Sequence, residues 1–267
     1  HYIKPFIPSK VRGSDWKSYP TDLIAQDLEF FKFVPGQKWH SFEGYGENQY
    51  FVDPCKFMLT TPGIDVETGE YEDFGVPATI LANYLRDNGI IPEKNDLNSI
   101  LFLMTPAENK EKMDHLVSQI ARFEKYLDDD APLEEVLPNL YKAYESRYRN
   151  YSIRQLCQEM HDFYKERNIK EDMFRTEFMP KSVINPQEAH FAFLRGQAEL
   201  VRLEDAEGRV AAEGALPYPP GVLCCFPGEV WGGPVLKYFL AWQEAMGRMP
   251  GFAPELQGVY VEDNGRG

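Results

Sequence analysis

The sequence has few cysteines and no long apolar run. Its four cysteines are Cys55, Cys157, Cys224 and Cys225, and no CxxC pair occurs among them. This spacing argues against a zinc site and a disulfide framework, and it favours reduced thiols in the cytoplasm. No apolar run approaches the ~20 residues that a transmembrane helix needs, and no signal peptide is recognised. We therefore expect no membrane partner.

Positive charge and metal-binding histidine patterns are scarce as well. The 267 residues include 28 basic and 42 acidic side chains, for a net charge of −14. Such acidity argues against nucleic acid as a partner. The five histidines show no HxxxH-type spacing, which predicts no metal site, and His115 is expected to be solvated. Hydrophobic residues make up 43% of the chain, enough for a substantial core.

The first half of the chain shows clear element signals only after an irregular start. Residues 1–75, rich in proline, glycine and aromatics, predict little beyond a strand over 55–60. A helix opening at Pro77 and closing at Asn88-Gly89 precedes short strands over 90–94 and 99–104. Thr105-Pro106-Ala107-Glu108 then predicts a capping box, with Glu108 at the third position of a long helix. The expected apolar face of that helix is Met113, Leu116, Val117, Ile120, Phe123 and Leu127.

The second half predicts a further mixture of helices and strands. Residues 133–148 are expected to form a connecting helix, and Ser152-Ile153-Arg154-Gln155 is a capping box for the next one. That helix should bury Ile153, Leu156, Cys157, Met160 and Phe163. The remaining expectations are a cap at Asn185-Pro186-Gln187-Glu188, a hairpin of 199–203 with 209–213, a buried strand over 222–226 and a helix over 233–246.

The segment 213–233, EGALPYPPGVLCCFPGEVWGG, places one tyrosine among prolines. Each proline fixes its own φ and disfavours helical geometry in the residue before it. Tyr218 therefore lies on a stiff, extended segment, where its phenol can line a pocket with little loss of entropy. A proline-rich turn between two strands explains the same pattern without a functional role.

LPYPPGV followed by PGE resembles the C-terminal part of the bacterial ornithine/lysine/arginine decarboxylases, which are pyridoxal-phosphate (PLP) enzymes of the aspartate-aminotransferase fold type. Further blocks resemble the ornithine-specific branch, in the expected order: HYIKPFIP, GENQYFVDPCKFMLTTPGID, GVPATILANYLRDNGIIPEKNDLNSILFLMTPAE, RQLCQEMHD and PGFAPELQGVY. The family's chains are much longer than this one, so the resemblance implies a C-terminal portion only.

The resemblance implies an α+β fold and a division into two parts. Residues 1–148 would hold the end of the large-domain region and the small domain of a fold-type I PLP enzyme. Residues 149–267 would form the mixed α+β C-terminal domain of the family. The intact enzyme would convert L-ornithine to putrescine and CO2, with PLP as the electron sink. Its partners would be the N-terminal portion and a second subunit, in a homodimer or a larger ring.

The family's cofactor-binding lysine is missing from this chain. In the family it follows a Ser-Xaa-His pattern, and no Ser-Xaa-His-Lys occurs here. The nearest string, Ser14-Asp15-Trp16-Lys17, lies in a polar segment before a proline and lacks accompanying motifs. We therefore predict no catalytic residue in this chain and no activity of the chain alone, with PLP bound mainly by the N-terminal portion.

Three residues are candidates for the substrate pocket. A carboxylate is the natural reader of the distal ammonium of ornithine. Glu93 has no helix-capping role. The resemblance implies that Glu93 and Tyr218 lie near the cofactor-bound substrate. Glu93 would bind the distal ammonium, and Tyr218 would be a pocket wall or hydrogen-bond donor. Glu108 is the weaker candidate, because a capping box explains it. Three other residues are given structural roles. Glu229 is expected at the start of a helix, in preference to a role as an acid that supports the site from outside it. Trp231 is expected to pack in the core, and Asp53 is expected to form an Asx turn.

Two alternatives to an ornithine decarboxylase stay open. One is a lysine or arginine decarboxylase of the same family, although LNSILFLMTPAE over 97–108 favours the ornithine branch. The other is a non-catalytic interaction module derived from such an enzyme, which the missing lysine supports equally. Because His1 is not a natural initiator, we expect a fragment, and the coding sequence upstream of His1 would separate the two.

Overall fold

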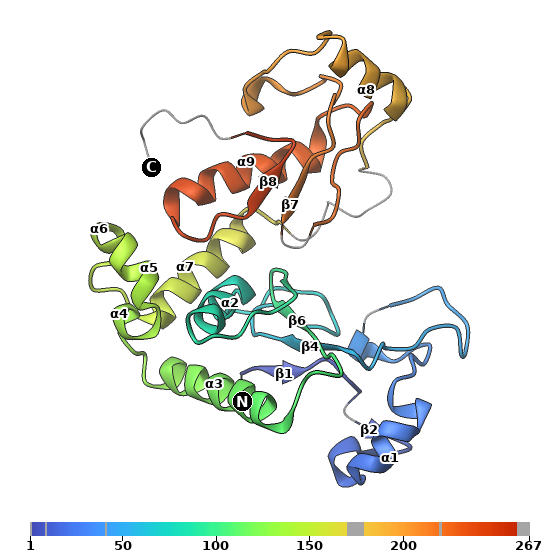
Figure 1. Ribbon diagram of the computed structural model, residues 1–267, viewed down its shortest axis with the longest axis vertical. Helices are drawn as coiled ribbons and strands as arrows, with labels where there is room; N and C mark the ends of the chain where they lie inside the picture. The colour runs from blue at the N-terminus through green and yellow to red at the C-terminus, as the bar shows by residue number, and fades with distance from the viewer. Residues whose placement is uncertain (1, 9, 41, 170–178, 219–220, 261–267) are drawn as a thin grey trace. The chain divides into compact units, whose positions relative to one another are not determined.

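The computed structural model describes residues 2–8, 10–40, 42–169, 179–218 and 221–260. The chain divides into two compact units, His1–His161 (unit 1) and Asp162–Gly267 (unit 2). Both contain small antiparallel sheets and helices (Figure 1), which confirms the predicted mixed α+β class. The expected boundary at 148/149 stays a prediction. Among helices of the described ranges, none has the length and apolar character needed to cross a bilayer.

A four-stranded antiparallel sheet organises unit 1. Its order is β1 (Lys4–Pro5), β4 (Lys56–Thr60), β6 (Ser99–Leu103) and β5 (Lys94–Asn95). Leu59 and Ile100 lie opposite each other in the register and are buried, as alternation along a half-buried strand requires. The strands predicted over 55–60 and 99–104 are confirmed to within one residue.

The strand predicted over 90–94 is wrong except at its last residue. Strand β5 begins only at Lys94, and Ile91 is 82% exposed. Pro92, which lacks an N–H group, stands in the middle of the predicted strand and cannot donate to a ladder there. Strand β5 therefore pairs with β6 through two residues, Lys94 and Asn95, and Glu93 lies immediately before this strand.

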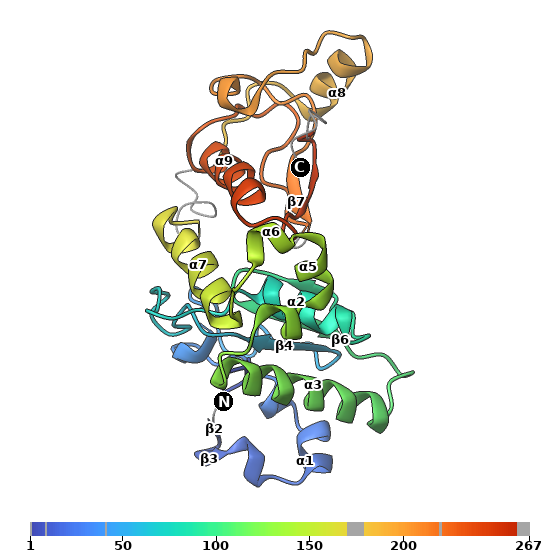
Figure 2. The same ribbon diagram turned by 90° about the vertical axis from the view of Figure 1, so that its left-hand side faces the viewer.

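Two helices supply the core beside this sheet. Helix α2 (Ala78–Asp87) ends where predicted, because Gly89 adopts a positive φ of 76°. Helix α3 (Lys110–Asp128) packs on α2 through Tyr84 and Phe123, with ring centroids 5.1 Å apart. It lies beside strand β1 (Figure 1), where the Ile3 amide donates to Glu124 Oε1 at 2.7 Å. Figure 2 shows α3 from the side.

The predicted apolar face of α3 is only partly correct. Leu116, Phe123 and Leu127 are buried as expected, but Val117 is 65% exposed. Tyr126, which was not predicted, is buried in addition. An aromatic with one polar atom can be buried where that atom finds a partner, and the phenol of Tyr126 accepts from Arg122 Nε at 2.9 Å.

The connecting region contains three short helices instead of the single predicted one. They are α4 (Leu133–Val136), α5 (Pro138–Ala143) and α6 (Glu145–Tyr148). Pro138 forces the break between the first two, because proline cannot continue a helix from the preceding turn.

Helix α7 (Ile153–Glu166) follows and begins with the predicted capping box. Ser152 Oγ accepts from the Gln155 amide at 3.2 Å, and Gln155 Oε1 accepts from the Ser152 amide at 2.9 Å. All five predicted inward residues are buried, namely Ile153, Leu156, Cys157, Met160 and Phe163.

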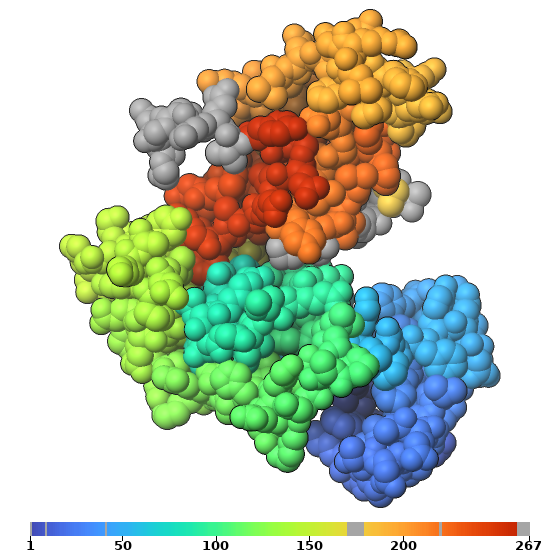
Figure 3. All heavy atoms as spheres, viewed as in Figure 1, coloured from blue at the N-terminus to red at the C-terminus, as the bar shows by residue number. Residues whose placement is uncertain are grey.

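The N-terminal segment is irregular, as expected, and is held by aromatic packing. It contains a hairpin of β2 (Lys10–Val11) with β3 (Ser14–Asp15) and one short helix, α1 (Thr21–Gln26). The segment also contains three 3-10 turns, at Trp16–Ser18, Leu28–Phe30 and Lys38–His40. The His40 ring is buried between Phe33 and Trp39, with centroids 4.9 Å from each. In the space-filling view the segment forms a lobe of its own on unit 1 (Figure 3).

Unit 2 is built around helix α9 (Gly233–Arg248), close to its predicted range. Its Val235 and Phe239 form a small buried core with Ala211, Ala215 and Cys225. Helix α8 (Pro186–Leu194) carries the predicted cap, since Asn185 and Glu188 form a complete capping box. Strand β7 (Leu216–Tyr218) pairs antiparallel with β8 (Glu255–Gln257). A 3-10 turn spans Leu203–Asp205.

Two strand predictions in unit 2 are wrong. Residues 199–203 form no strand, and the 209–211 backbone bonds instead to 229–231, with Ala211 N–H donating to Glu229 O at 2.7 Å. The predicted strand 222–226 is reduced to one bridge, between Ala215 and Cys225. Partners distant in sequence thus replaced the nearby ones that a hairpin pattern predicts.

Candidate functional site

Glu93 lies at one end of the four-stranded sheet, fixed through its backbone. Its amide donates to Leu101 O at 2.8 Å, and Lys94 pairs with Leu101 in the register, so Glu93 flanks the last residues of β6. Pro92 on its other side is buried. The side chain of Glu93 remains 37% exposed.

The partner of Glu93 is Lys56, not its neighbour Lys94. Lys56 is the first residue of β4 and lies opposite Leu103, at the same end of the sheet. Its Nζ is 3.9 Å from Glu93 Oε1, and its side chain is 48% exposed. Sequence reasoning did not find Lys56, because the contact joins the start of β4 to a residue that follows the whole of α2.

Glu108 lies outside helix α3, so its predicted capping role is wrong. The helix begins at Lys110, and its cap is Asn109, whose side chain accepts from the Lys112 amide at 2.9 Å. Glu108 instead closes a turn: Thr105 Oγ1 donates to Glu108 Oε1 at 3.2 Å. Its other oxygen pairs with Lys112 Nζ at 3.2 Å. The T-x-x-E pattern therefore formed a turn before the helix, because Asn109 is a competing cap four residues later.

The turn of Glu108 follows the same sheet end as Glu93. Met104 N–H donates to Cys55 O at 2.7 Å, which continues the β4–β6 ladder up to the turn. The structure thus brings both glutamates to one region of unit 1, each with a lysine against its carboxylate. Two carboxylates that face exposed ammonium groups can exchange those groups for the ammonium of a ligand.

Tyr218 belongs to unit 2, where it is the last residue of β7 opposite Glu255. Its side chain is half exposed, on the extended backbone that the prolines predict. The chain then turns back, with Gly221 N–H donating to Pro217 O at 2.9 Å. Gly221 has a φ of 78°, and a Cβ there would lie 2.9 Å from Tyr218 Cδ2. The glycine therefore leaves room for the Tyr218 ring; Pro219 and Pro220 lie outside the described residues.

The other residues singled out from the sequence have structural roles. The Asx turn of Asp53 is confirmed, since its Oδ1 accepts from the Cys55 amide at 2.9 Å. Trp231 packs on Phe239 with centroids 5.3 Å apart, also as predicted. Glu229 is not at a helix entry: its Oε2 accepts from the Phe226 amide at 2.7 Å and closes a turn.

His115 is exposed as predicted, but its Nε2 lies 3.0 Å from Asn88 O. Among the described residues, no group of acidic, histidine and cysteine side chains has the arrangement of a metal site.

The described residues do not make a PLP site. A lysine that forms a Schiff base needs a pocket that lowers its pKa and excludes water. Every lysine of the described ranges is exposed except Lys32, which is half-buried and pairs with Glu29. Ser14 and Lys17 are exposed as well. The lysines available here do not fit the group, in agreement with the missing Ser-Xaa-His-Lys motif.

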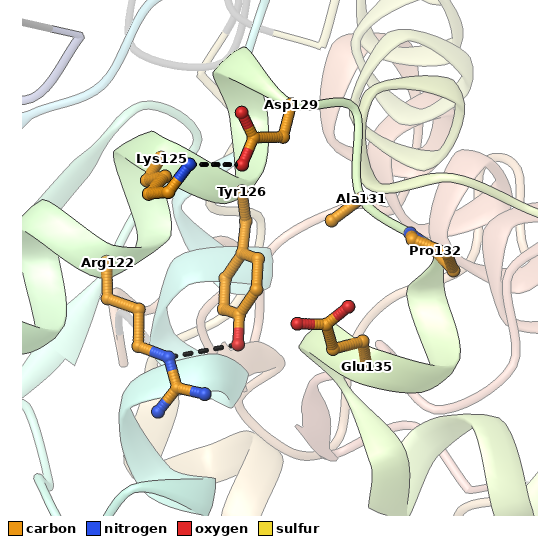
Figure 4. Close-up of a pocket in the computed structure, with 7 residues that line it drawn as sticks. All are labelled: Arg122, Lys125, Tyr126, Asp129, Ala131, Pro132 and Glu135. Carbon is orange, nitrogen blue, oxygen red and sulfur yellow. Dashed lines mark hydrogen bonds and ion pairs between the residues drawn. The ribbon is translucent and has the colours of Figure 1, made fainter.

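A pocket of about 380 Å³ lies elsewhere, where α3 ends and α4 begins (Figure 4). In Figure 4 the Tyr126 ring lies between Arg122 and Glu135, with the Arg122–Tyr126 hydrogen bond drawn. The pocket is lined by Arg122, Lys125, Tyr126, Asp129, Ala131, Pro132 and Glu135. None of the three candidate substrate residues belongs to it, so geometry alone does not connect this pocket to the candidate site.

Comparison with known proteins places the chain in one family. Residues 1–112 match the family model "Orn/Lys/Arg decarboxylase, major domain", and residues 167–267 match "Orn/Lys/Arg decarboxylase, C-terminal domain". The inducible ornithine decarboxylase of Escherichia coli (strain K12) is 65% identical over 98% of this chain and 36% of its own length. The constitutive ornithine decarboxylase of the same strain is 63% identical over 99% of this chain and 38% of its own length.

More distant members share the fold. The inducible lysine decarboxylase of Escherichia coli is 34% identical over 85% of this chain. The solved structure of lysine decarboxylase A from Pseudomonas aeruginosa superposes with a TM-score of 0.85 at 29% identity, over 99% of this chain and 35% of that one. The chain spans about a third of the length of these relatives, from 32% to 38%. It belongs to the Orn/Lys/Arg decarboxylase family, of which it carries sequence from the major domain and from the C-terminal domain.

Proposed function

We propose that this chain is the C-terminal part of an ornithine decarboxylase, which converts L-ornithine to putrescine and CO2 with PLP. The observation that carries the proposal is the gap in identity between two classes of relative: 65% for an ornithine decarboxylase against 34% for a lysine decarboxylase. A lysine or arginine decarboxylase is correspondingly disfavoured as the alternative.

In this proposal PLP belongs mainly to a part of the enzyme outside this chain, and the chain supplies substrate-pocket residues. Fold type I architecture, the boundary at 148/149, cytoplasmic location and assembly into a homodimer or larger ring are parts of the same proposal. Support for pocket residues in this chain is chemical: Glu93 and Glu108 present accessible carboxylates at one end of a rigid sheet.

Glu93 is the proposed reader of the distal ammonium, and Tyr218 is a pocket wall or hydrogen-bond donor. A carboxylate on a fixed backbone punishes a substrate whose cation lies at the wrong distance, because an unpaired charge in a closed site is costly. The fixed position of the Glu93 backbone supports this role. Glu108 is the weaker candidate, since it is already engaged by Thr105 and Lys112.

The test of the whole proposal is putrescine formation from ornithine and PLP. The chain is assayed alone and then together with the N-terminal portion of the enzyme. Activity only in the mixture supports the proposal, and activity of the chain alone contradicts the absence of a cofactor lysine. Silence in both leaves a non-catalytic interaction module open or shows that the two pieces do not reassemble, and the coding sequence upstream of His1 then separates these outcomes.

The test of the residue roles uses the full-length enzyme. Glu93→Gln is expected to raise the KM for ornithine strongly, about tenfold or more, because a charge-assisted hydrogen bond to the substrate is lost. Glu108→Gln serves as the matched control and is expected to change KM much less. Near-normal kinetics of the Glu93 variant would overturn its assignment.

A further inference from the structure

The contact between Lys56 and Glu93 has the properties of a displaceable ion pair. The backbones of both residues are held in the sheet: Lys56 lies opposite Leu103 in the ladder, and the Glu93 amide donates to Leu101 O at 2.8 Å. The side chains are the freely adjustable part, and both are more than a third exposed. Any rearrangement at this sheet end therefore falls on the Lys56 side chain rather than on the backbone.

The separation of 3.9 Å between Lys56 Nζ and Glu93 Oε1 is too long for a hydrogen bond. The contact is therefore a charge–charge attraction between exposed groups, which solvent weakens and which contributes little to stability. Lys56 neutralises the carboxylate and can leave at small cost.

The lysine side chain also resembles the ligand proposed for Glu93. Both present a primary ammonium at the end of a flexible alkyl chain, and both are read by a carboxylate in the same way. Only one ammonium can occupy the position nearest Oε1, because two like charges there repel. Lys56 and the distal ammonium of a substrate therefore compete for one position.

We propose that Lys56 is a specificity-determining residue that occupies the ammonium position of Glu93 until the distal ammonium of ornithine displaces it. This inference rests on the proposed role of Glu93. A substrate with a second ammonium replaces one ion pair by another. An amino acid without that ammonium leaves Lys56 in place and gains nothing from Glu93.

The experiment measures steady-state kinetics of the full-length enzyme that contains this chain. Lys56→Gln is expected to lower the KM for ornithine about two- to fivefold at low ionic strength, the range that corresponds to an exposed ion pair, with kcat unchanged. The inhibition constant of norvaline, which has the same carbon chain without the ammonium, is expected not to fall. The KM difference should disappear at high salt, where exposed charges are screened.

Three variants make the outcome decisive. Lys56→Arg keeps the charge and is expected to retain the normal KM, whereas Lys94→Gln removes a charge one residue from Glu93 and is also expected to leave KM unchanged. In a Glu93→Gln background, Lys56→Gln should have no further effect. If Glu93→Gln raises KM but Lys56→Gln also raises KM or leaves it unchanged, the displacement proposal is overturned while the proposed role of Glu93 stands. If Glu93→Gln leaves KM normal, the proposed role of Glu93 fails first.

Discussion

Unit 1 and unit 2 hold their chains together by different means. Unit 1 has a four-stranded ladder in continuous register, with Leu59 and Ile100 buried in it and α2 and α3 packed beside it. Unit 2 has a short two-stranded sheet, single bridges such as Val210 with Val230, and one central helix. The ladder of unit 1 spreads its stability over many contacts, whereas unit 2 depends on a few.

The core side chains give the sharpest test of this difference. Phe239 is the one aromatic member of the buried unit 2 cluster, whose other members are Ala211, Ala215, Cys225 and Val235. Phe239→Ala is expected to cost about 3–5 kcal/mol, the usual range for a buried phenylalanine. The partly buried Trp231 and Tyr238 would lose a packing partner as well, so unit 2 should unfold at a denaturant concentration that leaves unit 1 folded.

The matched variant is Phe123→Ala in α3, a residue equally buried in unit 1. It removes the same atoms but from a core that also includes Tyr84, Leu85 and Leu127. Urea unfolding followed by limited proteolysis and mass spectrometry would locate the cleavage. Equal loss of protection in both units after Phe239→Ala would contradict the comparison.

A glycine in unit 2 tests how far one contact can matter there. Gly228 has a φ of 91°, and a Cβ at this position would collide with the carbonyl oxygen of Ile184. Gly228→Ala is therefore expected to cost about 2–4 kcal/mol, from the unfavourable φ and from backbone displacement together. Gly208 has a φ of 77° but open space around it, so Gly208→Ala should cost only about 1 kcal/mol. Chemical denaturation measures the free energy of unfolding of both variants. Equal losses would show that the collision with Ile184 contributes nothing.

The thiols compare the units through reactivity. Burial raises the pKa of Cys224 to about 11 and that of Cys225 to about 12, from an ordinary value of 9.0. Cys157 is fully buried, and its pKa is raised further. Cys55 is exposed and should be modified first by iodoacetamide at pH 8, at least tenfold faster than the unit 2 thiols. Peptide mapping over time checks this order. Labelling of Cys224 before Cys55 would contradict it and would show that this part of unit 2 unfolds locally.

The same shifts set a pH dependence for unit 2. A raised thiol pKa means that the folded state binds the proton more tightly than the unfolded state does. The stabilisation is therefore complete below about pH 9 and is lost as the pH rises through about 11, where Cys224 ionises. The midpoint of thermal unfolding of unit 2 should fall across this window, and Cys224→Ala should reduce the fall.

Local signals in the sequence predicted most helices, but the single helix over 133–148 and the strands of unit 2 were predicted wrongly. The caps at Ser152 and Asn185 act on amides two or three residues away, so the sequence contains all the information that they need. The bridge from Ala215 to Cys225 and the bonds between 209–211 and 229–231 depend on how the chain folds back, which no local pattern encodes.

The candidate site shows the same division. Glu93 and Tyr218 were found through a family resemblance, and the extended backbone of Tyr218 followed from the prolines around it. The Lys56 partner of Glu93 was not predicted, because it depends on the register between strands far apart in sequence. Residue types therefore indicated the chemistry, but the lysine that pairs with Glu93 could be identified only from the folded structure.

The start of α3 tests the smallest effect, a choice between two caps in one segment. Sequence reasoning favoured Thr105 with Glu108, whereas the structure uses Asn109, whose side chain accepts from the Lys112 amide at 2.9 Å. Asn109→Ala is therefore expected to cost about 1 kcal/mol, the typical value of a lost cap. Glu108→Gln should cost less than half of that, because it weakens only an exposed pair with Lys112. If equilibrium unfolding instead shows the larger loss for Glu108→Gln, the capping box operates in solution and α3 begins earlier than Lys110.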